Sequence, residues 1–151
     1  MKQSQNKQTG FDFDLIANRY DLANRMISQG RDIHWRRKLV SAMTMRPGLR
    51  MLDLATGTGE VAILAAEQFP DSGEITALDY SGKMLEIARK KAAGRKISFV
   101  QGDMQELAFA EGSFDCVSCV FGLRNVPDPA RAIAEMYRVL SRGGEALILE
   151  F

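Results

Sequence analysis

The chain has 151 residues and a formal net charge of +1, with 46% hydrophobic and 26% charged residues. This composition is typical of a globular domain and argues against disorder, collagen and low-complexity sequence. The balanced charge argues against a broadly basic nucleic-acid-binding protein, so no nucleic-acid partner is expected. No apolar run reaches the roughly 20 residues of a membrane span, and the N-terminus lacks the apolar region of a secretory signal. We therefore expect a cytoplasmic protein.

The first third of the chain predicts helices. Residues 1–10 are polar and predict a disordered tail, whereas residues 11–46 carry apolar side chains at helical spacing, with a break at Gly30. The tripeptide Arg46-Pro47-Gly48 ends this pattern. The sequence therefore predicts an N-terminal helical cap over residues 11–46, followed by a second unit over residues 47–151.

Short apolar runs alternate with helical patterns in this second unit. They predict five strands, at residues 51–55, 75–78, 97–100, 114–120 and 146–151. Ser81 is placed to cap the helix after the second strand, and Gly143-Gly144 is expected to end the helix before the fifth. Strands that alternate with helices in this way form an α/β fold with a doubly wound, mostly parallel sheet.

The fifth strand raises a question about the edge of the sheet. An apolar edge strand has unpaired backbone groups and is prone to aggregate. We therefore expect either that C-terminal strands are missing from this chain or that a homodimer covers the exposed edge.

The two cysteines, Cys116 and Cys119, form a lone C-x-x-C within the fourth predicted strand. A zinc site needs further ligands at suitable spacing, so no metal site is expected. Three positions apart on a strand, the two side chains point to opposite faces. We interpret them as small buried hydrophobic residues, with a redox pair as the alternative.

The strongest chemical signal is the stretch from Asp53 to Gly59 (DLATGTG), between the first strand and the next helix. Glycines in such a turn let a ligand approach the backbone, and with Ala62 the turn also fits the G-x-G-x-x-A pattern of nicotinamide-binding proteins. However, a carboxylate at Asp53 would repel a diphosphate and would suit a ligand with an ammonium group. S-adenosylmethionine has an ammonium and a sulfonium group and no phosphate.

Two further acids are expected at the ends of the next two strands. Asp79 lies 20 residues after Gly59, where an acid can hold both ribose hydroxyls, and Asp103 could meet an adenine amino group. The alternative is that acids at strand ends are ordinary turn residues. The three acids together with the glycine-rich turn favour a nucleoside site.

At these residues the sequence resembles the Rossmann-like S-adenosylmethionine-dependent methyltransferases and, more narrowly, the ubiquinone/menaquinone biosynthesis C-methyltransferases. Four stretches carry the resemblance: Tyr20-Asp21-x-x-Asn24 with Ser28 and Trp35, Leu52 to Gly59, Phe121 to Val126 (FGLRNV), and Arg138 to Phe151. The glycine-rich turn is common to many methyltransferases, whereas FGLRN and the terminal LEF are much narrower. The resemblance runs from about Phe11 to the last residue.

The resemblance implies S-adenosyl-L-methionine as cofactor and a lipophilic quinol as substrate, with methyl transfer to a carbon of the ring of demethylmenaquinol or a ubiquinol precursor. By family position, the cofactor-binding residues are Asp53, Ala55, Gly57, Thr58, Gly59, Asp79, Tyr80, Asp103 and Met104. The catalytic residues implied in the same way are Arg124, Asn125 and Tyr20. In this hypothesis Arg124 stabilises the developing phenolate and Asn125 orients it.

Several alternatives stay open at this point. Arg124 could simply pair with an acid, Tyr20 could serve in packing, and His34 could be a general base or a surface residue. The basic stretch from Arg19 to Arg50 could contact anionic lipid at the inner membrane, or it could be a solvated face.

The sequence also departs from the family. Asp32 stands where many members have histidine, and Val120 stands where a small polar residue is common. Family members continue well past Phe151, so the expected domain over residues 47–151 is incomplete. The function hypotheses are quinol methylation, methylation of another small acceptor, a non-catalytic cofactor-binding fragment, and a nicotinamide oxidoreductase.

Overall fold

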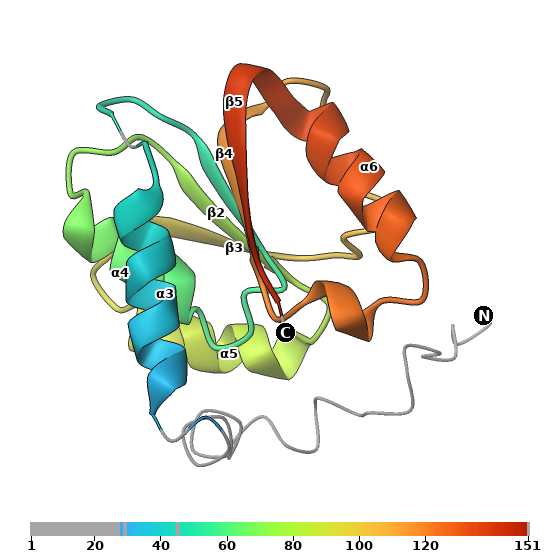
Figure 1. Ribbon diagram of the computed structural model, residues 1–151. Coiled ribbons are helices and arrows are strands. Elements are labelled where there is room, and N and C mark those ends of the chain that lie inside the picture. Colours follow the sequence, from blue (N-terminus) through green and yellow to red (C-terminus); the bar gives the residue numbers. More distant parts are fainter. Residues whose placement is uncertain (1–27, 29, 45, 151) are drawn as a thin grey trace.

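The computed structural model of the chain describes residues 28, 30–44 and 46–150 (Figure 1). The expected tail over residues 1–10 and the part of the expected cap before Ser28 lie outside these residues. Within them, the model contains a five-stranded sheet in which every neighbouring pair of strands is parallel. The predicted α/β class is therefore confirmed. No helix among the described residues is long and apolar enough to cross a membrane.

The strands occur in the order β3-β2-β1-β4-β5 across the sheet. Their bounds are Met51–Leu54 (β1), Ile75–Asp79 (β2), Ile97–Gln101 (β3), Phe114–Val120 (β4) and Leu140–Leu149 (β5). The chain first moves outward from β1 to β3 and then returns to β4 on the other side of β1. The order therefore reverses between β1 and β4, and ligands bind at such a switch point in doubly wound sheets.

Helices cover both faces of the sheet. On one side lie α3 (Arg31–Ala42), α4 (Glu60–Gln68) and α5 (Gly82–Lys91), and on the other lie the 3₁₀ turn η2 (Leu123–Asn125) and α6 (Pro129–Val139) (Figure 1). The side chain of Ser81 caps α5 by accepting a hydrogen bond from the backbone N–H of Met84, as predicted. These crossovers bury the sheet on both faces, which explains its continuous apolar strands.

Side chains of the fourth strand, β4, pack against the helices on both faces of the sheet. Cys116 packs with the α3 and α4 layer, whereas Cys119 packs with the α6 layer. Both thiols are free and buried, and burial raises the pKa of each to about 12. The prediction that they act as small hydrophobic residues on opposite faces is confirmed.

The end of α6 differs from the sequence prediction. The helix ends at Val139 and β5 begins at the next residue, so Gly143-Gly144 lies within a strand and does not terminate the helix. Pairing with β4 shifts register between Phe114 and Cys116, and a Cβ on Gly144 would lie 2.9 Å from the Asp115 carbonyl oxygen. The glycine pair therefore accommodates an irregularity in the sheet.

Candidate functional site

Asp53 lies within β1, one residue before its end, and its carboxylate is buried, with 1% of the residue exposed. One carboxylate oxygen accepts a hydrogen bond from the Ser118 hydroxyl at 2.6 Å, and the other accepts one from the Thr56 hydroxyl at 2.6 Å. Burial nevertheless raises the pKa of Asp53 to about 6, against the opposing effect of the two hydroxyl groups. Positive charge nearby would favour the ionised form of Asp53. The carboxylate is therefore suited to accept a hydrogen bond from a cationic group.

The turn after β1 is tied to the end of β2. The carboxylate of Asp79 accepts from the backbone N–H of Gly57 at 2.7 Å and from that of Ser81 at 2.9 Å. Gly57 and Gly59 both have positive φ, at 57° and 84°, a conformation that favours glycine. Asp79 therefore fixes the turn and stands beside the backbone that a ligand would meet.

A pocket opens between this turn and helix α3. Its lining comprises Arg36, Asp53, Ala55, Thr56, Gly57, Thr58, Glu60, Val61 and Val120. The lining thus includes four of the predicted cofactor residues (Asp53, Ala55, Gly57 and Thr58), and one wall comes from α3 of the expected cap. The side chain of Val120 faces this pocket as a purely apolar group.

Thr58 and two further predicted cofactor residues, Gly59 and Tyr80, lie at or near this turn. The Thr58 hydroxyl accepts a hydrogen bond from the Lys91 ammonium at 3.0 Å, so it links α5 to the turn. Gly59 packs against α5, where an added Cβ would lie 3.1 Å from the Cβ of Ala88. Tyr80 follows β2 directly and is 40% exposed, so its ring is available to a ligand at this edge of the sheet.

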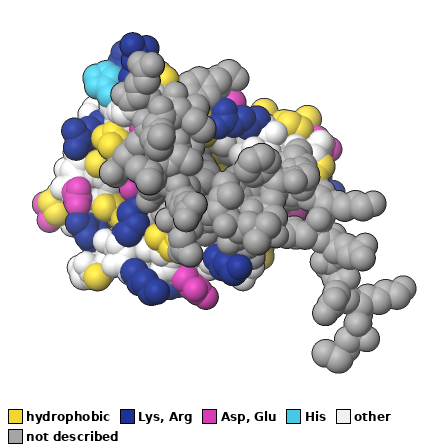
Figure 2. All heavy atoms as spheres, turned by 90° about the horizontal axis from the view of Figure 1, so that it is seen from below, with side chains coloured by type: hydrophobic (Ala, Val, Ile, Leu, Met, Phe, Trp, Pro, Cys, Tyr) yellow, Lys and Arg dark blue, Asp and Glu magenta, His cyan; other side chains and the backbone are white. Residues whose placement is uncertain are grey.

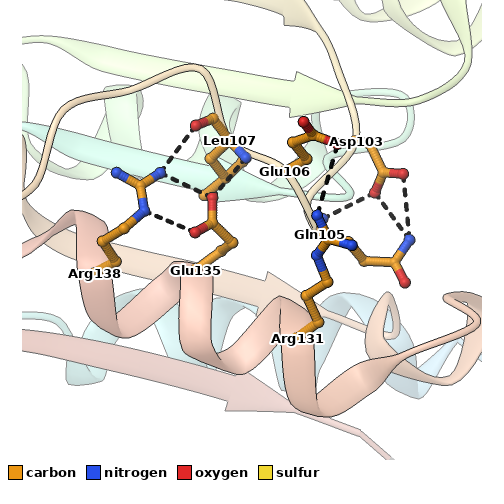
Figure 3. Close-up of polar contacts among 7 residues, drawn as sticks. All are labelled: Asp103, Gln105, Glu106, Leu107, Arg131, Glu135 and Arg138. Atoms are coloured by element: carbon orange, nitrogen blue, oxygen red, sulfur yellow. Dashed lines mark hydrogen bonds and ion pairs between the residues drawn. The ribbon is translucent and has the colours of Figure 1, made fainter.

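Asp103 lies two residues past β3, at the start of an irregular loop (Figure 3). Its carboxylate accepts from the side-chain amide of Gln105 at 3.1 and 3.2 Å and from the backbone N–H of Gln105 at 2.8 Å. The side-chain amide oxygen of Gln105, Oε1, in turn accepts from the backbone N–H of Asp128, the N-cap of α6. Gln105 therefore fixes Asp103 relative to α6, and Met104 beside it is buried.

The rest of this loop is fastened to α6 by Glu135 and Arg138 (Figure 3). Glu135 accepts from the backbone N–H of Leu107 at 2.7 Å, and Arg138 donates to the carbonyl oxygens of Leu107 and Phe109 at 2.9 and 2.7 Å. Arg138 also donates a hydrogen bond to the carboxylate of Glu135, and this bond lowers the pKa of Glu135. These charge-assisted bonds give a loop without regular structure a defined position.

The residues after β4 form a separate group around Phe121. Arg36 and Arg124 each place a guanidinium carbon 5.4 Å from the centre of the Phe121 ring. Arg124 also lies 3.6 Å from the carboxylate of Glu150, and the Asn125 amide donates to the Phe121 carbonyl oxygen at 3.0 Å. The alternative that Arg124 pairs with an acid is therefore seen, and its role in turnover stays a prediction.

The structure brings together some of the predicted site residues and not others. Asp53, Asp79 and Asp103 all belong to the carboxyl edge of the three adjacent strands β1, β2 and β3. Asp79 is close enough to Asp53 to influence its pKa, whereas Asp103 has its own network with α6. Tyr20 lies outside the described residues.

Two of the open alternatives, at His34 and in the basic stretch, concern the surface at this end of the molecule. His34 is exposed on α3 and is not among the residues that line the pocket (cyan in Figure 2). In the parts of this face that Figure 2 draws in colour, Lys and Arg side chains lie at several separate places, with acidic and apolar side chains among them. A lipid contact by the basic stretch therefore stays a prediction.

Arg36 and Gln105 are among the residues of the site that sequence reasoning did not single out. Arg36 is 7% exposed and lines the pocket, and Gln105 is 8% exposed and holds Asp103. Neither belongs to a glycine-rich or acidic motif. The only signal for Arg36 was its helical spacing of four residues from Asp32, which permits the ion pair that the structure shows.

Comparison with known proteins places these features in a family. The chain matches the model of the ubiE/COQ5 methyltransferase family over residues 1–151. A ubiquinone/menaquinone biosynthesis C-methyltransferase UbiE of Geotalea daltonii is 44% identical in an alignment of 143 residues that covers 92% of this chain and 61% of that protein. A demethylmenaquinone methyltransferase of Thermus thermophilus is 44% identical in an alignment of 141 residues that covers 92% of this chain and 64% of that protein. The chain thus spans about three fifths of the length of these relatives.

Solved structures agree with the architecture. An S-adenosylmethionine-dependent methyltransferase from Mesorhizobium loti is similar with a TM-score of 0.66 and 30% identity, over 74% of this chain and 50% of that one. The predicted Rossmann-like fold is thereby confirmed. Because the family model matches over residues 1–151, and the curated relatives match over nine tenths of the chain, the chain belongs to the ubiE/COQ5 methyltransferase family.

Proposed function

We propose that the chain binds S-adenosylmethionine and transfers its methyl group to a ring carbon of a lipophilic quinol. This quinol is either demethylmenaquinol or a ubiquinol precursor. The observation that carries this proposal is the buried carboxylate of Asp53 in the wall of the glycine-turn pocket. A dinucleotide would bring a diphosphate to such a turn, and Asp53 would repel it. A ligand with an ammonium group and no phosphate is attracted by the same carboxylate.

The backbone around the pocket fits a nucleoside ligand. A Cβ added to Gly122 would lie 2.5 Å from the Cβ of Ala55, so the turns after β1 and β4 pack directly against each other at the switch point. Ala55 has positive φ, at 51°, and so has Gly57 beside it. Asp79 offers carboxylate oxygens for the ribose hydroxyls, and Asp103 offers acceptors for an amino group on the base.

The chemistry at the other end of the site is the transfer itself. When bound, S-adenosylmethionine would supply an electrophilic methyl group there. The ring carbon would accept that group, the sulfur would keep the bonding electrons, and the ring carbon would release its hydrogen as a proton. A phenolate on the ring raises the electron density at the attacking carbon. Arg124 is placed after β4 as a cation that would stabilise this phenolate, with Asn125 and Tyr20 as the other proposed acceptor-side residues.

Two measurements test the proposal on the full chain. Calorimetry with S-adenosylhomocysteine and with NADH decides the ligand class, and we expect binding of the first and none of the second. Transfer of a labelled methyl group to a demethylmenaquinol with a short tail then tests the acceptor. Binding of NADH in place of S-adenosylhomocysteine would contradict the proposal at its root. Cofactor binding without transfer to this quinol or to other small phenols would favour the non-catalytic alternative.

A further inference from the structure

Arg36 is a buried cation in the wall of the same pocket as Asp53. It comes from α3, whereas most of the other lining residues come from β1, the turn after it and the start of α4. A buried arginine is costly unless its charge is used, because the folded protein takes it out of water. Asp32 supplies one partner for this charge, and a ligand in the pocket would supply another.

The guanidinium of Arg36 is held in a fixed orientation. One nitrogen lies 2.5 Å from the carboxylate of Asp32, one helical turn earlier, and Asp32 accepts a second bond from the hydroxyl of Ser28 at 2.9 Å. The guanidinium carbon lies over the Phe121 ring, 5.4 Å from the ring centre. Phe121 itself has positive φ, at 56°, with its backbone N–H bonded to the carbonyl of Leu149 at 2.8 Å. Only one edge of the guanidinium is used by Asp32, and an arginine carries five donors.

The pocket therefore presents groups of both signs. Arg36 lies near enough to Asp53 to lower its pKa, against the larger effect of burial. Glu60, the other acid in the lining, already pairs with Lys91. What the pocket offers a ligand is thus one carboxylate and one guanidinium close together, which is the complement of an α-amino acid with its ammonium and carboxylate. A dinucleotide or a simple nucleoside has no such pair.

We infer that Arg36 binds the α-carboxylate of the methionyl end of the cofactor while Asp53 accepts its α-ammonium. This inference rests on the proposed function, and it names the residue that selects cofactors with an amino-acid end. It also gives α3 a binding role, because Arg36 reaches the pocket from that helix. Asp32 is then a positioning residue that holds the guanidinium in place.

The experiment compares two ligands that differ only at that end. S-adenosylhomocysteine carries the amino acid, and 5′-methylthioadenosine lacks it. By calorimetry on the full chain, Arg36→Gln should weaken binding of the first by roughly tenfold or more, as expected for a lost charge-assisted bond, and leave the second within about twofold. Arg36→Lys should restore part of the loss. Arg37→Gln, at an exposed position on the same helix, should change neither affinity.

Removal of Arg36 alone leaves Asp32 as a buried unpaired charge and could unfold the chain. The double variant Asp32→Asn/Arg36→Gln avoids this, and circular dichroism verifies its fold. Unchanged affinity for S-adenosylhomocysteine in this variant would overturn the inference, and so would an equal loss of both ligands, which would indicate a structural role. If the unaltered chain binds neither ligand, the proposed function itself fails, and that outcome is distinct from both.

Discussion

The two ends of the site are built in different ways. At the cofactor end, Asp53 and Asp79 are bound to hydroxyl and backbone groups at 2.6 to 2.9 Å, and these partners belong to β4 and to the turns after β1 and β2. At the acceptor end, the Arg124 side chain is 46% exposed, and its carboxylate partner Glu150 lies 3.6 Å away. The first end is fixed by short internal contacts, whereas the second is held by a longer ion pair that is partly exposed.

This difference teaches which function each end can carry. A pre-organised site binds without the cost of ordering its side chains, so cofactor affinity should depend on single buried groups. An exposed ion pair contributes little to stability, so changes at Arg124 should leave the fold and the cofactor site intact. Four predictions test this contrast.

The largest effect is expected at the acceptor end. Arg124→Ala should abolish methyl transfer to the quinol while affinity for S-adenosylhomocysteine stays within about twofold, because the phenolate loses its cation and the cofactor loses nothing. Turnover assays with labelled methyl groups and calorimetry measure the two quantities. Arg142→Ala, an exposed arginine of β5, serves as the control. An equal loss of turnover and cofactor affinity would assign Arg124 a structural role instead.

The second effect is at Asp53. Asp53→Asn should weaken binding of S-adenosylhomocysteine by roughly 10- to 100-fold, because the ammonium loses a charged acceptor. The same variant should melt at a higher temperature than the parent at pH 7 without ligand, since a buried charge is removed. Calorimetry and thermal melts check the two effects. A variant that binds as tightly as the parent would show that Asp53 has no contact with the ligand.

The pH dependence of Asp53 sharpens this prediction. Its pKa in the folded protein, about 6, lies above the ordinary value of 3.8, so the folded state binds more protons than the unfolded state between these values. The group therefore lowers the free energy of unfolding increasingly as the pH rises through this window. The difference in melting temperature between Asp53→Asn and the parent should be present at pH 7 and small at pH 4. Ligand affinity of the parent should fall below pH 6.

A smaller effect is expected at Gln105. Gln105→Glu keeps the shape of the side chain but places a second carboxylate against Asp103, and the repulsion between the two carboxylates should disturb the acceptor for the base. We expect binding of S-adenosylhomocysteine to weaken by roughly three- to tenfold, and its advantage over S-inosylhomocysteine to shrink. Gln68→Glu, at an exposed position at the end of α4, is the control. A loss that is equal for both nucleosides would remove Asp103 from recognition of the base.

The smallest effect concerns the scaffold. Asp115 accepts hydrogen bonds from the backbone and side chain of Arg50 and from Ser141, and the pKa of its carboxyl is held well below its ordinary value. It therefore stabilises the fold above pH 4, and this contribution is lost as the pH falls further. Asp115→Asn should lower the melting temperature by a few degrees at pH 7 and by less at pH 3. Asp71→Asn, in an exposed turn, should have no such effect.

How much of this molecule could be predicted from sequence depends on the kind of signal. The strands β1 to β4 follow from apolar runs, because a sheet covered on both faces needs continuous apolar strands. Gly143-Gly144 misled the prediction, since two glycines can mark a helix end or an irregular strand, and only the pairing with β4 decides between them. For the same reason the fifth strand was predicted to begin at residue 146, whereas β5 begins at Leu140.

The residues of the site also fall into those that could be predicted from the sequence and those that could not. Asp53 and Asp79 could be found because a strand, a turn and an acid follow one another in the chain. Arg36 and Gln105 could not, since their roles depend on contacts with Phe121 and Asp128, which lie far away in sequence. Tyr20 keeps its predicted role as an expectation, outside the described residues.

The placement of Cys116 and Cys119 has a practical consequence. Their sulfur atoms lie on opposite faces of β4, so a disulfide between them is not compatible with the folded sheet. Each thiol can react with an alkylating reagent only when its own layer opens. The two alkylation rates, measured by mass spectrometry with and without ligand, would report separately how tightly the cofactor fastens the α3 and α4 layer and the α6 layer to the sheet.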